Sequence, residues 1–161
     1  MNATTPQESA PGPATVVIDH PEGPLEVPAS AVVQLTEPLY GFPDRLEYVL
    51  IPAARQGLWW FISVHQPTVT FVVADPFVGK PEFSIDLGEI ERQQLGIAAV
   101  DDVLVLVMLA LPGPAGGDVT ANFRAPVVLN LRTRVGMQIL GTRETDRLAE
   151  PVDLARYAMV D

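Results

Sequence analysis

Apolar side chains occur along this chain in short runs that turn-forming residues separate. The runs at 58–64 and 69–74 are rich in Val, Ile, Phe and Trp, and residues 65–68 between them are His, Gln, Pro and Thr. Runs of this length and composition, bounded by Pro and polar residues, are typical of β-strands. We therefore expect these two segments to pair as an antiparallel hairpin.

A first hairpin is expected near the N-terminus. The extended runs 15–18 and 25–27 flank residues 20–24, which contain two prolines and a glycine and therefore require a turn. Further extended segments are expected at 31–35, 46–51, 103–111 and 119–122, and at 127–132 and 136–141, which form a second hairpin.

Both faces of the central strands are predicted to be covered. In the run 69–74 the odd positions are large and apolar, while the even positions are Thr, Val and Ala. Successive side chains of a strand point to opposite faces, so neither face of this strand has the polar side chains of a solvent-exposed surface. By the same rule Trp59 and Trp60 lie on opposite sides of their strand, and at most one of them can lie in the core.

The only convincing helix follows residue 85. Asp86 is expected as its N-cap with Glu89 reaching back to the backbone, and Gly96 can end the helix in a left-handed conformation. The buried side of this helix is expected to consist of Leu87, Ile90 and Leu95.

These elements predict an all-β fold with minor α content: a small antiparallel β-barrel-like single domain with one short helix, because closure removes exposed strand edges. We expect three parts: a disordered tail at residues 1–14, the barrel domain at 15–142, and a charged C-terminal tail at 143–161 with a loose helix around 151–158.

The amino-acid composition indicates the cellular compartment of the protein. The chain has no Cys, which excludes disulfides and Cys-ligated zinc and favours a reducing cytoplasm. The longest apolar run, 103–111, is far shorter than the ~20 residues of a membrane helix. Residues 1–14 contain no Lys or Arg and do not resemble a signal peptide. We expect a cytoplasmic protein without a membrane partner.

The net charge of the chain indicates which classes of partner it can bind. The formal net charge is −10, and most of the excess lies in residues 1–91. Binding to nucleic acid normally depends on Lys and Arg at the phosphates, so direct nucleic-acid binding is disfavoured. A basic protein partner would be attracted, although an acidic surface also keeps proteins dispersed without any partner.

Candidate catalytic and binding residues are few. Ser63 and His65 share one segment, but no nucleophile motif surrounds Ser63, so His65 is interpreted as a turn residue. An alternative function, a small-ligand-binding or metal-dependent hydrolytic β-barrel, would use Asp75, Asp101 and Asp102.

A polar, basic stripe is expected on one face of the strand that contains Asn130, Arg132 and Arg134. Such a stripe fits a solvated face or a binding face.

Several motifs occur in an order that is similar to the flagellar assembly factor family FliW. The segment Thr70–Phe77 matches its Phe-Val-Val-x-Asp-Pro pattern, and Ala121–Asn130 matches Ala-Asn-Leu-x-Ala-Pro-Ile-Val-Ile-Asn. Leu39–Pro43 stands at its Gly-x-Pro-Gly-Phe-like loop, and Gly136–Ile139 matches its closing Gly-x-Gln-Val. Departures include Phe61-Ile62-Ser63, where relatives usually have Leu-Gln-Ser.

The resemblance implies a cytoplasmic, non-enzymatic β-barrel protein that binds flagellin and antagonises the RNA-binding translational regulator CsrA, which couples flagellin synthesis to filament assembly. It implies no cofactor and no metal. We expect Phe42 to anchor the partner from its loop, with Asn122, Asn130 and Gln138 as polar groups flanking a shared surface. Asn122 and Asn130 can alternatively satisfy backbone groups at strand ends.

Overall fold

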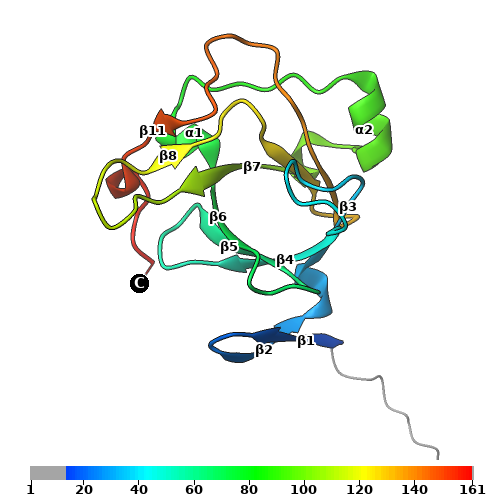
Figure 1. Cartoon of the computed structure of the whole chain (residues 1–161). Helices are drawn as coiled ribbons and strands as arrows, with labels where there is room; N and C mark the ends of the chain where they lie inside the picture. The colour runs from blue at the N-terminus through cyan, green and yellow to red at the C-terminus, as the bar shows by residue number, and fades with distance from the viewer. Residues whose placement is uncertain (1–13, 161) are drawn as a thin grey trace, which may run out of the picture.

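A computed structural model describes residues 14–160 of the chain (Figure 1). The disordered tail expected at residues 1–14 lies, except for its last residue, outside the described residues. The strands are β1 (Thr15–His20), β2 (Gly23–Pro28), β3 (Val32–Leu35), β4 (Glu47–Pro52), β5 (Leu58–Ser63), β6 (Thr70–Ala74), β7 (Val103–Ala110), β8 (Thr120–Ala121), β9 (Val127–Asn130), β10 (Val135–Gln138) and β11 (Glu150–Pro151).

Seven of the strands close into a ring. Neighbours pair in the order β7-β6-β5-β4-β3-β10-β9, and β9 pairs again with β7. The β5–β6 and β9–β10 hairpins are present as predicted. The expected small β-barrel is confirmed, and closure leaves no free edge in the ring.

One pair in the ring differs from the antiparallel expectation. β10 runs parallel to β3, with Val135 opposite Gln34, whereas the other pairs of the ring are antiparallel. The reason is topological: strand directions cannot alternate all the way around a closed ring with an odd number of members. A seven-stranded ring therefore requires at least one parallel pair.

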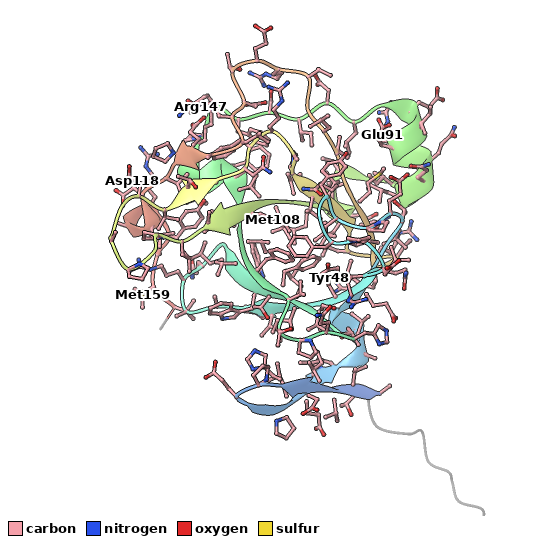
Figure 2. All side chains as sticks on the ribbon, viewed as in Figure 1. Tyr48, Glu91, Met108, Asp118, Arg147 and Met159 are labelled. Atoms are coloured by element: carbon pink, nitrogen blue, oxygen red, sulfur yellow. The ribbon has the colours of Figure 1, made fainter. Side chains whose placement is uncertain are left out.

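Alternate side chains of the ring fill the barrel interior. Tyr48 lies there (Figure 2), stacked on Phe61 with ring centroids 4.6 Å apart. Trp59 packs against this cluster, whereas Trp60 is 43% exposed on the other side of β5, as the alternation predicts. The buried interior residues are Val33, Leu35, Leu39, Tyr48, Leu50, Phe61, Val73, Leu106, Val127 and Leu129.

The β1–β2 hairpin covers one outer face of the barrel and is confirmed as predicted. It forms a separate two-stranded sheet below the ring (Figure 1), and its Ile18 and Val27 are buried against Val49 and Ile62. Burying side chains of this size contributes about 2 kcal/mol each. The outer faces of β4 and β5 are therefore apolar because a second layer covers them.

Two short α-helices, α1 (Pro76–Gly79) and α2 (Glu89–Leu95), pack on the opposite outer face, which also holds Tyr157. The helix α2 starts later than predicted, since its N-cap is Gly88 and not Asp86, and the Glu91 carboxylate accepts the Gly88 N–H at 2.8 Å. Gly96 ends the helix at φ 65°, as predicted.

The buried side of α2 is narrower than expected. Leu95 is buried and Leu87 is half-buried, but Ile90 is 66% exposed, so its prediction as a core residue is wrong. The helix spans only about two turns and reaches the core cluster through its last residue, which leaves its first turn in solvent.

The segment after residue 142 packs on the barrel. Its strand β11 pairs with β8, and Lys80 lies 3.0 Å from Glu150 and 3.6 Å from Asp146. Instead of the loose helix expected around 151–158, the chain forms a three-residue 3-10 helix, η3 (Leu154–Arg156), and then buries Tyr157. Other 3-10 turns are η1 (Ala29–Ala31) and η2 (Val100–Asp102). Within the part of the chain that the structure describes, no helix is long and apolar enough to cross a membrane.

Candidate functional site

Gln138 connects two segments that are far apart in the sequence. Its Oε1 accepts the Tyr40 N–H at 2.9 Å, and its Nε2 donates to the Ala125 carbonyl at 3.0 Å. The loop that contains Tyr40 is thereby held against the end of β10 through its backbone. The Tyr40 side chain remains 59% exposed.

Phe42 lies in the same loop and is half-buried. Its ring packs edge-to-face on Phe71, with centroids 4.9 Å apart, and its N–H donates to Leu39 O at 2.9 Å. Gly41, at φ 87°, supplies the left-handed conformation that this turn requires. The loop is therefore fixed at its base by an aromatic contact and presents Tyr40 outward.

Asn122 shapes the neighbouring segment. Its Oδ1 accepts the N–H groups of Arg124 at 3.1 Å and Ala125 at 3.0 Å, which forms a local turn before Pro126. Because Gln138 binds the Ala125 carbonyl, this turn connects to the aromatic loop. We call Tyr40, Phe42, Asn122 and Gln138 the loop surface.

Asn130 does not belong to the loop surface. It ends β9, is fully buried, and its Nδ2 donates to the carbonyls of Leu95 at 2.7 Å and Gly96 at 3.1 Å. Its Oδ1 accepts the N–H groups of Arg132 at 2.9 Å and Thr133 at 3.2 Å. Asn130 thus attaches the C-terminus of α2 to the β9–β10 turn.

The polar stripe expected from Asn130, Arg132 and Arg134 is absent, and that expectation is wrong. β9 ends at Asn130, and the chain turns before β10, with Arg134 at φ 61°. Strand alternation therefore does not apply to these positions. Burial lowers the pKa of the Arg134 guanidinium, whose Nε has no hydrogen-bond partner among residues 14–160.

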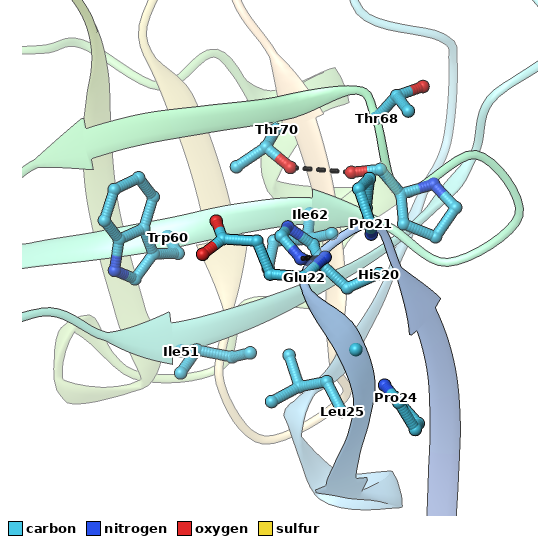
Figure 3. Close-up of a pocket in the computed structure, with 12 residues that line it drawn as sticks. His20, Pro21, Glu22, Pro24, Leu25, Ile51, Trp60, Ile62, Thr68 and Thr70 are labelled. Atoms are coloured by element: carbon cyan, nitrogen blue, oxygen red, sulfur yellow. Dashed lines mark hydrogen bonds between the residues drawn. The ribbon is translucent and has the colours of Figure 1, made fainter.

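A groove that sequence reasoning did not predict lies beside the β1–β2 hairpin. The groove has a volume of about 750 Å³ and lies between the hairpin tip and the outer face of strands β4 to β6 (Figure 3). Ile51, Trp60, Ile62 and Leu25 provide apolar walls. The exposed Trp60 was the one feature that could have indicated it.

The hairpin beside this groove is acidic. Asp19, Glu22 and Glu26 are exposed, and residues 15–44 contain no Lys or Arg. Glu22 lines the groove, and its N–H donates to His20 Nδ1 at 3.2 Å. The unequal charge of the sequence is therefore concentrated partly on one protruding element.

The residues of the alternative hydrolytic function have separate structural contacts. Ser63 Oγ accepts the Gln66 N–H at 3.2 Å, while His65 Nε2 lies 2.6 Å from Glu47 Oε1. Asp75 caps α1 by accepting the Phe77 N–H.

Asp101 and Asp102 lie in η2, and Asp102 pairs with Arg132 at 3.5 Å. Among the residues described, no three His, Asp or Glu side chains form a group that could hold a metal ion. The described residues therefore do not bring Asp75, Asp101 and Asp102 together as a metal site.

Comparison with known proteins identifies the family. The family model described as FliW protein matches residues 17–152. A flagellar assembly factor FliW of Treponema pallidum is 32% identical over 117 residues, which cover 73% of this chain and 77% of the relative. That of Geobacillus thermodenitrificans is 32% identical over 120 residues, covering 74% and 83%.

A solved structure agrees with the sequence relatives. A crystal structure of the flagellar assembly factor FliW superposes with a TM-score of 0.75 at 28% identity, covering 86% of this chain and 96% of that chain. The fold of this chain is thus shared with a protein of this name. This chain belongs to the FliW family of flagellar assembly factors.

Proposed function

We propose that this protein binds flagellin through the loop surface and antagonises CsrA in the cytoplasm, without catalysis, so that flagellin synthesis follows filament assembly. Family membership is the observation that carries the proposal. The relatives are named flagellar assembly factors, and flagellin is the subunit from which a filament is assembled.

The loop surface supports flagellin binding because it is preorganised. Gln138 holds the backbone at Tyr40 and the Phe42 ring rests on Phe71, so little conformational freedom remains to be lost on binding. An exposed Tyr on a fixed loop is also the kind of residue that contributes most at protein interfaces.

The net negative charge of the chain supports binding of CsrA. An RNA-binding regulator carries basic surface for phosphates, and the net charge of −10 attracts such a surface. Antagonism then follows if the complex withholds CsrA from its RNA. Linkage between the two partners follows if flagellin and CsrA cannot bind the same molecule independently.

Titration calorimetry against the flagellin and CsrA of the same organism tests the proposal. We expect the wild-type protein to bind both, and Gln138→Ala to weaken flagellin binding about tenfold because the loop is released. Gln93→Ala, which removes the same amide from an exposed position on α2, is the matched control. Absence of binding to either protein would overturn the proposed function.

A further inference from the structure

We propose that the groove beside the β1–β2 hairpin is a second docking surface, and that it takes an amphipathic helix whose apolar side carries a Lys or Arg at its edge. The inference goes beyond the proposed function because it concerns other residues than the loop surface. It rests on the shape of the groove, on its backbone and on its charge.

The groove can accept apolar side chains. Its floor contains Ile51 and Ile62, and Leu25 of β2 and Trp60 of β5 face it from two sides (Figure 3). Trp60 is 43% exposed, although its neighbours Leu58, Phe61 and Ile62 on the same strand are buried. An aromatic ring left open at an apolar groove is typical of a protein-binding site.

The backbone of the hairpin wall argues against an added strand. The Ala29 N–H donates to Ala14 O, and cross-strand hydrogen bonds alternate along an antiparallel pair. This alternation leaves Pro24, Glu26 and Pro28 as the β2 residues whose backbone groups point away from β1. Proline has no N–H, so this edge offers a single donor to a partner.

The opposite wall offers no backbone partner either. Strands β4, β5 and β6 lie inside the closed ring and are paired on both sides. An extended segment in the groove would therefore leave its own backbone groups unsatisfied. A helix satisfies its backbone internally and needs only an apolar side to bind here.

The negative charge of the hairpin wall favours a helix with a Lys or Arg at the edge of its apolar side. Figure 3 shows the Glu22 carboxylate directed from the hairpin tip toward Trp60. A guanidinium or ammonium between them would meet an aromatic face and a carboxylate together, which strengthens its binding. The hairpin carries no Lys or Arg that could occupy this position itself.

The test uses a synthetic helical peptide of about 14 residues, about 21 Å long, with Leu along one side and one Arg at the edge of that side, and without Trp. Binding is followed by the fluorescence of Trp59 and Trp60, the two tryptophans of the chain. We expect the emission to shift to shorter wavelength. An Arg→Glu peptide, and a Pro-containing peptide of otherwise equal composition, should bind much more weakly.

Variants locate the binding. We expect Trp60→Ala, read by calorimetry, to weaken binding of the Arg peptide about tenfold and Glu22→Gln about threefold. Glu26→Gln removes the same charge from the outer face of the hairpin, and Phe77→Ala removes an aromatic side chain that is also 43% exposed. Both controls should leave the affinity unchanged, and thermal melts establish that each variant is folded.

Three outcomes would overturn the inference: equal binding of the Arg and Glu peptides, equal binding of the Pro-containing peptide, or unchanged affinity of both Trp60→Ala and Glu22→Gln. A dimer that dissociates on Trp60→Ala, together with no peptide binding, would also overturn it by showing that a second copy occupies the groove. Flagellin and CsrA titrations of the same variants separate this result from failure of the proposed function.

Discussion

The amide side chains of Asn122, Asn130 and Gln138 form their hydrogen bonds with the main chain. Asn130 forms four hydrogen bonds, all to main-chain groups, and the side-chain hydrogen bonds of Asn122 and Gln138 also go to the main chain. Groups that are already satisfied have little to offer a partner directly. Their contribution to binding, if the proposed function holds, is to fix the shape of the loops around Tyr40 and Phe42.

Asn130→Ala should destabilise the protein by about 2–3 kcal/mol, because it removes four main-chain hydrogen bonds from a fully buried amide, two of which hold the end of α2. Urea unfolding measures the loss. Asn122→Ala, at a half-buried position with two bonds, should cost about 1 kcal/mol. Equal costs at the two positions would contradict the importance assigned to burial.

Tyr48→Phe should leave stability unchanged or raise it by about 1 kcal/mol. The Tyr48 hydroxyl is buried in the barrel interior and has no hydrogen-bond partner among the residues described. Burial also raises the pKa of this hydroxyl. Phe retains the stacking on Phe61, so a clear loss of stability in urea unfolding would reveal a partner for the hydroxyl.

At the scale of elements, the C-terminal segment packs against the barrel. The Tyr157 ring packs over Gly57 and Gly79, and a Cβ at Gly79 would lie 2.9 Å from the Tyr157 hydroxyl oxygen. Arg55 donates to the Leu154 and Tyr157 carbonyls at 3.3 and 3.0 Å. A glycine between β4 and β5 and a glycine at the end of α1 thus create the space in which this segment docks.

Tyr157→Phe should remove part of the alkaline unfolding of the protein. Burial first, and then the Asp75 charge, raise the pKa of Tyr157 to about 12 from its ordinary 10.0. Because the folded-state pKa is the higher one, this stability is complete below pH 10 and is lost between pH 10 and about 12.

Urea unfolding at pH 8, 10 and 11 measures the effect. At pH 8 the variant should lose about 1 kcal/mol with the hydrogen bond from the Tyr157 hydroxyl to Asp75 O. Its stability should then fall less steeply above pH 10 than that of the wild type. Identical slopes would contradict the assignment, and Tyr48→Phe is the control for the other buried phenol.

The molecule as a whole is a closed barrel with an acidic hairpin on one side. Strand edges are unavailable in the ring, so a partner cannot add a strand to it. The net charge of −10 then acts mainly on the rate at which a basic partner arrives.

Under the proposed function, association with CsrA should therefore slow about tenfold or more as NaCl rises from low to high concentration, measured by stopped-flow fluorescence. Asp19→Asn on the hairpin should reduce the rate at low salt more than Asp118→Asn does. Both carboxylates are exposed, and Asp118 lies in the loop before β8, away from the hairpin (Figure 2). A rate that does not depend on salt would exclude electrostatic attraction as the reason for the acidic surface.

Local sequence was sufficient for the strands of the ring, the β1–β2 and β9–β10 hairpins, the opposite placement of Trp59 and Trp60, and the Gly96 helix end, but not for β11. Alternation and turn propensity act between residues a few positions apart, so a single sequence contains them. It was also sufficient for the family resemblance, through the ordered motifs.

Four features could not be predicted from local sequence: the parallel β3–β10 pair, the burial of Asn130, the docking of Tyr157 and the groove at Trp60. Each depends on segments that meet only when the ring closes: Asn130 on the end of α2, Tyr157 on Gly57 and Gly79, and the groove on a hairpin packed against β4 and β5. Propensity contains no information about which distant surfaces come into contact, and these contacts determine the candidate binding surfaces.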